Sequence, residues 1–201
     1  MKRELARKAI HVSSTAVPLL VWLLPRPVAI SLLVPVALLA LAIDLARHRI
    51  RPFRYHFLRH TRTMLRHHER HGLAGATWMA LAYAAALLLF PKPVAVAAML
   101  FNGLGDAAAA LAGKRWGRHR TRWGKSWEGF AAGLAVDVGV GVAMWMLVPS
   151  AVSLGAALLG AAVAAAIEFA PLPLDDNVRV TLGGGAGIML GLTLFPPSNI
   201  L

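Results

Sequence analysis

Seven apolar runs, separated by short segments that hold nearly all of the charge, constrain this chain more than any other feature of its sequence. They lie at residues 12–24, 28–43, 73–90, 94–111, 130–147, 151–167 and 178–195. Most reach the roughly 17 residues that a tilted helix needs to cross a bilayer, although the first run is shorter. Only 15% of the residues are charged, against about a quarter in soluble domains. The sequence therefore predicts an all-α, polytopic membrane helix bundle: one integral-membrane domain over residues 1–201 with about seven transmembrane helices.

The positions of the basic residues predict how this bundle is oriented. If the N-terminus is cytoplasmic, 19 of the 21 Lys and Arg residues fall on the inner face, and only Arg26 and Lys92 lie outside. That asymmetry follows the positive-inside rule. The net charge of +12 then reflects basic cytoplasmic loops, and we expect no nucleic-acid partner. The chain has no cysteine, which excludes disulfides, thiolate metal sites and cysteine nucleophiles.

Residues 47–71 form the longest basic segment, with eight Arg and six His interleaved with aromatic and apolar side chains. This pattern predicts an interfacial amphipathic helix on the cytoplasmic side, lying on anionic headgroups. A histidine metal site is the alternative. It is less favoured because His67 and His71 alone have a convincing ligand spacing.

An acidic residue in an apolar run is costly, so each one needs a reason. Asn102 and Asp106 are four residues apart in the sequence Phe-Asn-Gly-Leu-Gly-Asp, which places them on one helix face. Gly103 and Gly105 allow local unwinding or the close approach of another backbone. Asp106 is thus a candidate metal ligand, or else a hydrogen-bonded residue on a helix-packing face.

A basic cytoplasmic loop at residues 113–126 leads into the fifth apolar run. Gly124-Lys125-Ser126 resembles the end of a P-loop, but His119 stands where its first glycine belongs and no strand precedes it, which excludes a true P-loop. Ser126 can still cap the following helix, whose free N–H groups attract phosphate, while Lys125 supplies a positive charge. Glu128 would face the same pocket or pair with Lys125. The alternative is an ordinary basic loop.

An acidic cytoplasmic loop at residues 168–177 joins the last two runs. Glu168, Asp175, Asp176 and Asn177 supply the hard oxygen ligands that Mg²⁺ prefers. A solvated turn would also explain them.

Taken together, these motifs resemble the CTP-dependent lipid-alcohol kinases, a family that includes dolichol (polyprenol) kinase, phytol kinase and yeast-type diacylglycerol kinase and is distantly similar to phosphatidate cytidylyltransferases. The matching residues are Arg7-Lys8 with His11, Gly105-Asp106, Gly113 and Gly117, Lys125-Ser126 with Glu128-Gly129, and Glu168 with Asp175-Asp176-Asn177. The resemblance implies a membrane-embedded kinase that transfers a phosphoryl group from CTP to a lipid alcohol at the cytoplasmic face, with Mg²⁺ as cofactor.

The resemblance also implies roles for individual residues. The expected Mg²⁺ ligands are Asp106 with Asp175 or Asp176. Contacts to the nucleotide and its phosphates are expected from Arg7, Lys8, Lys114, Arg122, Lys125, Ser126 and Asn177. The expected catalytic groups are Asp106 and Lys125, with Glu128, Glu168 or His11 as the base or orienting group.

Other functions remain open at this point. A cytidylyltransferase would consume a lipid phosphate, and a small transporter could use Asp106 and Asp137, although the runs show no clear inverted repeat. A lipid-surface adaptor would leave the acidic motifs unexplained. Asp137 lies about 16 Å beyond Ser126 along a helix, so we expect it to have a supporting role and Asp137→Asn to keep most turnover. The identity of the lipid alcohol and a homodimeric state are not decided by the sequence.

Overall fold

The computed structural model describes residues 13–61, 69 and 72–197. Within these residues the regular elements are helical, and an isolated bridge between Arg120 and Ser126 is the one β-type pairing. The elements are α2 (Ala16–Leu23), α3 (Arg26–Arg49), α4 (Arg51–Thr61), α5 (Gly75–Leu89), α6 (Lys92–Leu100), the π-helix η2 (Phe101–Gly105), α7 (Asp106–Trp116), α8 (Trp127–Leu147), α9 (Leu154–Phe169) and α10 (Asp176–Leu194). The predicted all-α class is confirmed.

Within the described part of the chain, three helices are long and apolar enough to cross a membrane. They are Arg26–Arg49, the continuous helix Lys92–Trp116 formed by α6, η2 and α7, and Trp127–Leu147. Helices α5 and α9 are apolar but shorter. These helices are consistent with the predicted membrane protein.

Two Pro-X-Pro turns connect helices at one end of the structure. Pro25 and Pro91 immediately precede α3 and α6, and a second proline lies in the first turn of each helix, where a missing N–H is tolerated. The basic residue inside each turn reaches the end of the helix that precedes the other turn: Arg26 Nη2 donates to Leu87 O at 3.1 Å, and Lys92 Nζ donates to Leu24 O at 2.7 Å. The two basic residues expected outside the cytoplasmic face thus hold the α2–α3 and α5–α6 connections together.

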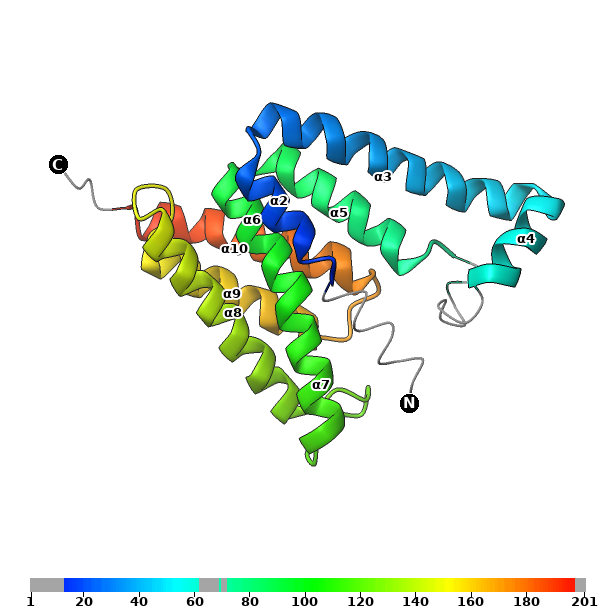
Figure 1. Cartoon of the computed structure of the whole chain (residues 1–201). Coiled ribbons are helices and arrows are strands. Elements are labelled where there is room, and N and C mark those ends of the chain that lie inside the picture. Colours follow the sequence, from blue (N-terminus) through cyan, green and yellow to red (C-terminus); the bar gives the residue numbers. More distant parts are fainter. Residues whose placement is uncertain (1–12, 62–68, 70–71, 198–201) are drawn as a thin grey trace.

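The continuous α6–η2–α7 helix contacts α2, α5, α8, α9 and α10, whereas α3 lies outside α5 (Figure 1). Helix α3 runs beside α5, and α7, α8, α9 and α10 pack in chain order, with α10 also contacting α5 and α6. Small residues allow α9 and α10 to approach each other closely. A Cβ on Gly160 would lie 3.1 Å from Gly184 O, and one on Gly191 would lie 3.0 Å from Ala156 Cβ. Close backbone contact of this kind is typical of helices that associate in membranes.

The structure corrects the start of the amphipathic helix expected at residues 47–71. Arg47 belongs to α3 and is only 1% exposed, because it pairs with buried Asp44 and donates to Glu69 O at 2.9 Å. Asp44 in turn accepts from Ala74 N at 2.8 Å, just before α5. The amphipathic helix is α4, which begins at Arg51, and residues 62–68 and 70–71 lie outside the described part.

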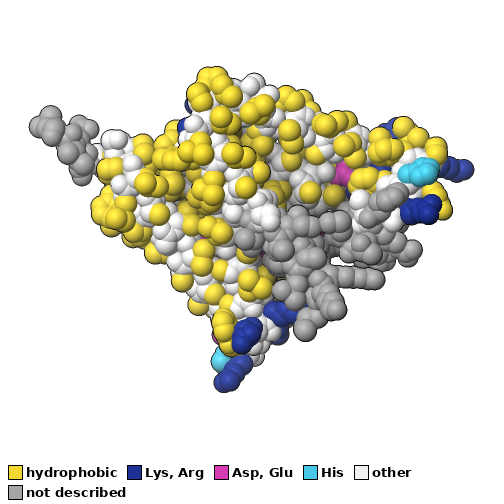
Figure 2. Space-filling view, viewed as in Figure 1, with side chains coloured by type: hydrophobic (Ala, Val, Ile, Leu, Met, Phe, Trp, Pro, Cys, Tyr) yellow, Lys and Arg dark blue, Asp and Glu magenta, His cyan; other side chains and the backbone are white. Residues whose placement is uncertain are grey.

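Basic side chains gather mainly in two places on the face shown in Figure 2, while apolar side chains cover most of the rest. One place is the end of α3 with α4, and the other is the tip where α7 ends and α8 begins. The site described next uses the N-termini of α7, α8 and α10 and the C-terminus of α9.

Candidate acidic site

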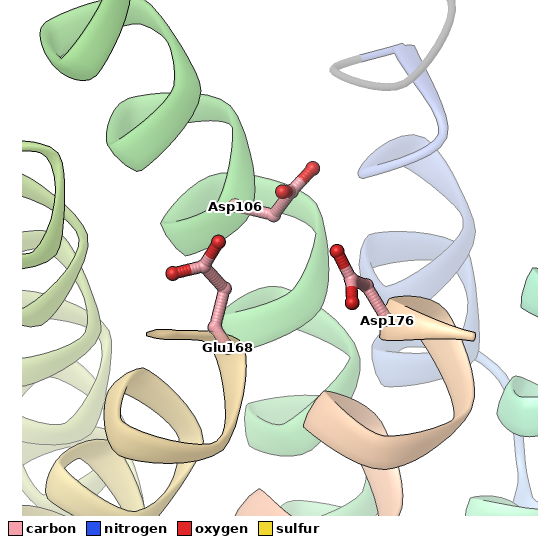
Figure 3. Close-up of side chains that lie close together, drawn as sticks. All are labelled: Asp106, Glu168 and Asp176. Carbon is pink, nitrogen blue, oxygen red and sulfur yellow. The ribbon is translucent and has the colours of Figure 1, made fainter. Parts of the chain in front are cut away.

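Three carboxylates from three helices converge in the structure (Figure 3). Asp106 begins α7, Glu168 is the last but one residue of α9, and Asp176 begins α10. One oxygen from each side chain lies within 4.8 Å of the other two. Asp106 and Asp176 are partly buried and Glu168 is buried. The predicted association of Asp106 with the acidic loop is therefore present, with Asp176 and Glu168 as its partners.

Local structure explains how these residues reach one another. The π-helix η2 ends at Gly105, directly before Asp106, and π-helical turns are often found at functional sites. The loop from α9 to α10 carries Pro171 and Pro173, which stiffen the approach to α10. Asp175 is the N-cap of α10, and its Oδ1 accepts from Asn177 N at 3.0 Å. Asp175 thus turns its carboxylate to the backbone, whereas Asp176 presents its own to the cluster.

Two basic side chains offset the negative charge of the cluster. Lys125 Nζ donates to Glu168 Oε1 at 2.6 Å and also to the Glu168 carbonyl oxygen, and it lies 3.6 Å from Asp176 Oδ2. Arg179 pairs with Asp176 and donates to Ala170 O at 2.6 Å. Arg179 was not among the expected site residues, although its spacing of three residues from Asp176 on a helix could have indicated the pair.

The donor set of the cluster fits a hard divalent cation. Carboxylate oxygens are the ligands that Mg²⁺ and Ca²⁺ prefer, and Asp106, Glu168 and Asp176 supply them from three separate elements. Three carboxylates so close together repel one another unless cations lie nearby. Lys125 already supplies one such charge, so the site is built to hold positive charge.

Asn177, an expected phosphate contact, joins three elements in the structure. Its Nδ2 donates to Asp175 Oδ1 at 2.8 Å and to Gly75 O at 3.3 Å, and its Oδ1 accepts from Asn102 Nδ2 at 3.1 Å. These bonds tie α10 to the start of α5 and to η2. Asn177 therefore supports the loop that carries Asp176.

Ser126 is the N-cap of α8, as its position before the helix predicted. Its Oγ accepts from Gly129 N at 3.1 Å, and the residue is 4% exposed. Gly113 and Gly117 make room for it, since a Cβ on either would lie 2.8 Å from Ser126 Oγ. The structure buries this hydroxyl between α7 and α8 and does not bring it to the acidic cluster.

The remaining expected residues lie apart from the cluster or outside the described residues. Glu128 accepts from His119 Nδ1 at 2.7 Å and from His119 N at 3.1 Å, so it supports the basic loop rather than Lys125. Lys114 and Arg122 are exposed on the last turn of α7 and in the loop that follows. Arg7, Lys8 and His11 lie outside the described residues.

Asp137 is the residue whose surroundings differ most from expectation. It is 2% exposed on α8, and its Oδ1 is buried without a hydrogen-bond partner among the described residues. A Cβ on Gly105 would lie 2.7 Å from Asp137 Cγ and 2.8 Å from its Oδ2. The carboxylate therefore fills the space beside the residue that precedes Asp106.

The antiparallel packing of α7 and α8 explains this position. Close contacts pair Gly113 with Ser126, Ala109 with Gly129, and Gly105 with Asp137. Residues further along α8 therefore lie beside earlier residues of α7, nearer to Asp106. The distance along α8 from Ser126 to Asp137 therefore does not separate Asp137 from Gly105, which directly precedes Asp106.

Comparison with known proteins gives one distant similarity of full length. The chain is 26% identical over 198 residues to an uncharacterized protein of Rickettsia prowazekii (strain Madrid E), with 96% of this chain and 95% of that protein covered. No protein-family model matches the chain. No solved structure shows significant similarity to it.

Proposed function

We propose that this protein is a membrane-embedded kinase that transfers a phosphoryl group from a nucleoside triphosphate, CTP by family resemblance, to the hydroxyl of a lipid alcohol. The observation that carries the proposal is the convergence of Asp106, Glu168 and Asp176 beside Lys125. Phosphoryl transfer depends mainly on positioning and on neutralising charge with metal ions and basic groups. A cluster of three carboxylates with a lysine ammonium supports that chemistry.

Each residue of the cluster has a separate task in this proposal. Asp106, Glu168 and Asp176 would hold Mg²⁺, which supplies positive charge to the phosphates when it is bound. Lys125 would add a point charge, because its long side chain already reaches the carboxylates from the start of α8. Arg179 would keep Asp176 in place through their ion pair. Exposed Lys114 and Arg122 would attract the nucleotide to this end of the molecule.

The proposed topology brings both substrates to the cluster. Seven transmembrane spans with a cytoplasmic N-terminus put residues 113–126 and 168–177 on the cytoplasmic face. A nucleotide would then arrive from the cytosol, while the lipid alcohol would present its hydroxyl from the bilayer. Resemblance to the lipid-alcohol kinases supports this arrangement, since the family motifs at Asp106, Lys125, Glu168 and Asp176 are the residues that meet in the structure.

The experiment is an assay of purified protein with Mg²⁺, CTP or ATP, and a panel of polyprenol, phytol-like alcohol and diacylglycerol. A kinase should produce the phosphorylated lipid and a nucleoside diphosphate. Asp106→Asn keeps the shape of the residue but removes its charge, and should lower turnover by at least a hundredfold. Asp175→Asn is the matched control, because asparagine also caps helices well.

The same assay separates the kinase from the alternatives. With a lipid phosphate in place of the alcohol, release of pyrophosphate from CTP would identify a cytidylyltransferase. Absence of any phosphorylated lipid across both nucleotides and all three alcohols would reject the kinase.

A further inference from the structure

Exposed tryptophans gather at the tip of the structure, residues 113–127, where α7 ends and α8 begins. Trp116 is the last residue of α7, Trp123 lies in the loop that follows, and Trp127 is the first residue of α8. Their exposed fractions are 63%, 41% and 56%. Large apolar rings that are exposed together mark an interaction surface. The other three tryptophans are only partly exposed: Trp22, Trp78 and Trp145.

Contacts with the end of α9 hold two of these rings in place. Trp123 Nε1 donates to Phe169 O at 3.0 Å. The centroid of the Trp127 ring lies 4.7 Å from that of Phe169, and the centroid of Phe130 lies 5.1 Å from it. Trp123, Trp127, Phe130 and Phe169 therefore form one aromatic cluster over the adjoining ends of α8 and α9.

Basic side chains accompany the exposed rings. The Arg115 guanidinium lies 5.6 Å from the centroid of Trp116, and that of Arg122 lies 5.9 Å from the centroid of Trp123. Residues 113–127 carry six Lys and Arg and no acid. Figure 2 shows basic side chains at the tip and apolar side chains over the helices that lead to it. A surface with this charge attracts anionic groups.

The length of α8 relates the tip to a bilayer. Its 21 residues span about 30 Å, which matches the thickness of the hydrocarbon core. Trp127 begins the helix, and Met146 and Leu147, which are 70% and 63% exposed, end it. Only 22% of its most apolar stretch is buried inside the protein. A hydrocarbon core that covers this helix therefore ends at Trp127.

We propose that Trp116, Trp123 and Trp127 anchor the tip in the interface of a bilayer that contains anionic lipids, with the arginines of the tip on the lipid phosphates. Tryptophan is enriched at membrane interfaces because its ring is apolar and its N–H is polar. Basic side chains at that depth favour anionic headgroups. A bilayer fits better than a soluble partner, because the exposed apolar flank of α8 continues directly from the rings.

This anchoring also sets the depth of one carboxylate of the acidic site. Glu168 directly precedes Phe169, whose ring contacts Trp127. Glu168 therefore lies near the level of the lipid headgroups. The anchoring does not depend on the proposed kinase function, and the test that follows needs no turnover.

The depth of the rings is measured on the full chain in nanodiscs whose lipids carry bromine at defined positions of the acyl chain. The fluorescence lost in Trp116→Phe and in Trp127→Phe isolates the contribution of each ring. Bromine close to the headgroup should quench these contributions more strongly than bromine near the end of the chain. Trp145→Phe is the matched control, because it removes a partly buried ring at the other end of α8 and should leave quenching of the tip rings unchanged.

A second measurement tests the headgroups without altering the rings. Spin-labelled phosphatidylglycerol should be held at the protein surface in preference to spin-labelled phosphatidylcholine. Arg115 and Arg118 are exposed at the tip. Replacing both by glutamine should lower this preference by at least about twofold, whereas replacing both by lysine keeps the charge and should preserve it.

Two results would overturn the inference. One is quenching of the tip rings by acrylamide dissolved in water but not by brominated lipid, which would leave the tip free for a soluble partner. The other is an unchanged preference for phosphatidylglycerol in the variant with both glutamines.

Discussion

The carboxylate of Asp137 occupies the space that a side chain at Gly105 would need. A Cβ at that position would lie 2.7 Å from Asp137 Cγ, nearer than two such carbons can approach. The pair joins α8 to the end of η2, directly before Asp106. The Asp137 carboxylate thus leaves no space for a side chain at position 105. The effect on stability of substituting either residue should therefore depend on which residue stands at the other position.

Gly105→Ala should destabilise the protein by about 1–3 kcal/mol, the usual cost of adding volume to a well-packed interior. The cost should largely disappear in the Asp137→Ala background, because the alanine leaves room for the new methyl group. Unfolding in mixed detergent micelles, measured for the four members of this double-mutant cycle, gives the coupling.

Gly139→Ala is the control for the effect of alanine itself on helix α8. A Cβ at Gly139 would meet nothing within 4 Å, so this variant should gain the roughly 0.5–1 kcal/mol by which alanine is favoured over glycine in a helix. Equal costs for Gly105→Ala with and without Asp137 would show that the two residues do not compete for space.

The helical class and the acidic residues of the site could be read from the sequence, because hydropathy and residue type carry that information locally. Apolar runs predict helices, and Asp106, Glu168 and Asp176 stood out as acids near their ends. The packing of α7, α9 and α10 decides which of these acids come into contact. The spacing of residues within one segment does not reveal that packing. The choice between Asp175 and Asp176 depended on which one caps α10.

The surroundings of Asp137 were missed for a similar reason. Its depth was measured along α8 from Ser126, but its neighbour in the structure is Gly105, directly before Asp106 on the adjacent helix. Asp137 and Asp106 lie on two antiparallel helices. The distance along α8 from Ser126 to Asp137 therefore does not give the distance between Asp137 and Asp106. The burial of Arg47 was missed because its bonds to the carbonyl oxygens of Glu69 and Gly72 form only through the fold, although Asp44 lies three residues before it on the same helix.

Ser126→Ala should destabilise the protein by about 1 kcal/mol through loss of the α8 cap. Stabilisation by Mg²⁺ and CTP should persist, since the hydroxyl is buried between α7 and α8. Ser153→Ala removes the equivalent cap of α9, where Ser153 Oγ accepts from Ala156 N at 3.2 Å, and should cost a similar amount. Loss of the nucleotide effect in Ser126→Ala alone would assign the hydroxyl to phosphate binding.

Arg47→Met should destabilise the protein strongly, by about 3–5 kcal/mol, because it leaves the buried charge of Asp44 without its partner. Arg49→Met, two residues away and exposed, should change stability by less than about 0.5 kcal/mol. Thermal unfolding followed by tryptophan fluorescence compares the two variants. Similar melting temperatures for both would show that the Arg47 contacts add little.

Single cysteines test the proposed orientation, and the chain has none to remove. A cysteine at Arg120, in the basic loop, should react with a membrane-impermeant reagent only from the cytoplasmic side. A cysteine at Lys92, in the Pro-X-Pro turn at the other end, should react only from outside. Labelling of both positions from one side would contradict the proposed arrangement of spans.

Asp176→Asn and Asp175→Asn should differ sharply, although the two residues are adjacent. Asp176 contributes an oxygen to the cluster, so its loss should weaken binding of the divalent cation. The rise in melting temperature produced by Mg²⁺ with CTP should then shrink or vanish, because stabilisation by a ligand follows its affinity. Asp175 caps α10 through Asn177 N, and asparagine can accept the same bond. Asp175→Asn should therefore keep both the melting temperature and its rise. The reverse result would place the cation at Asp175 and remove Asp176 from its ligands.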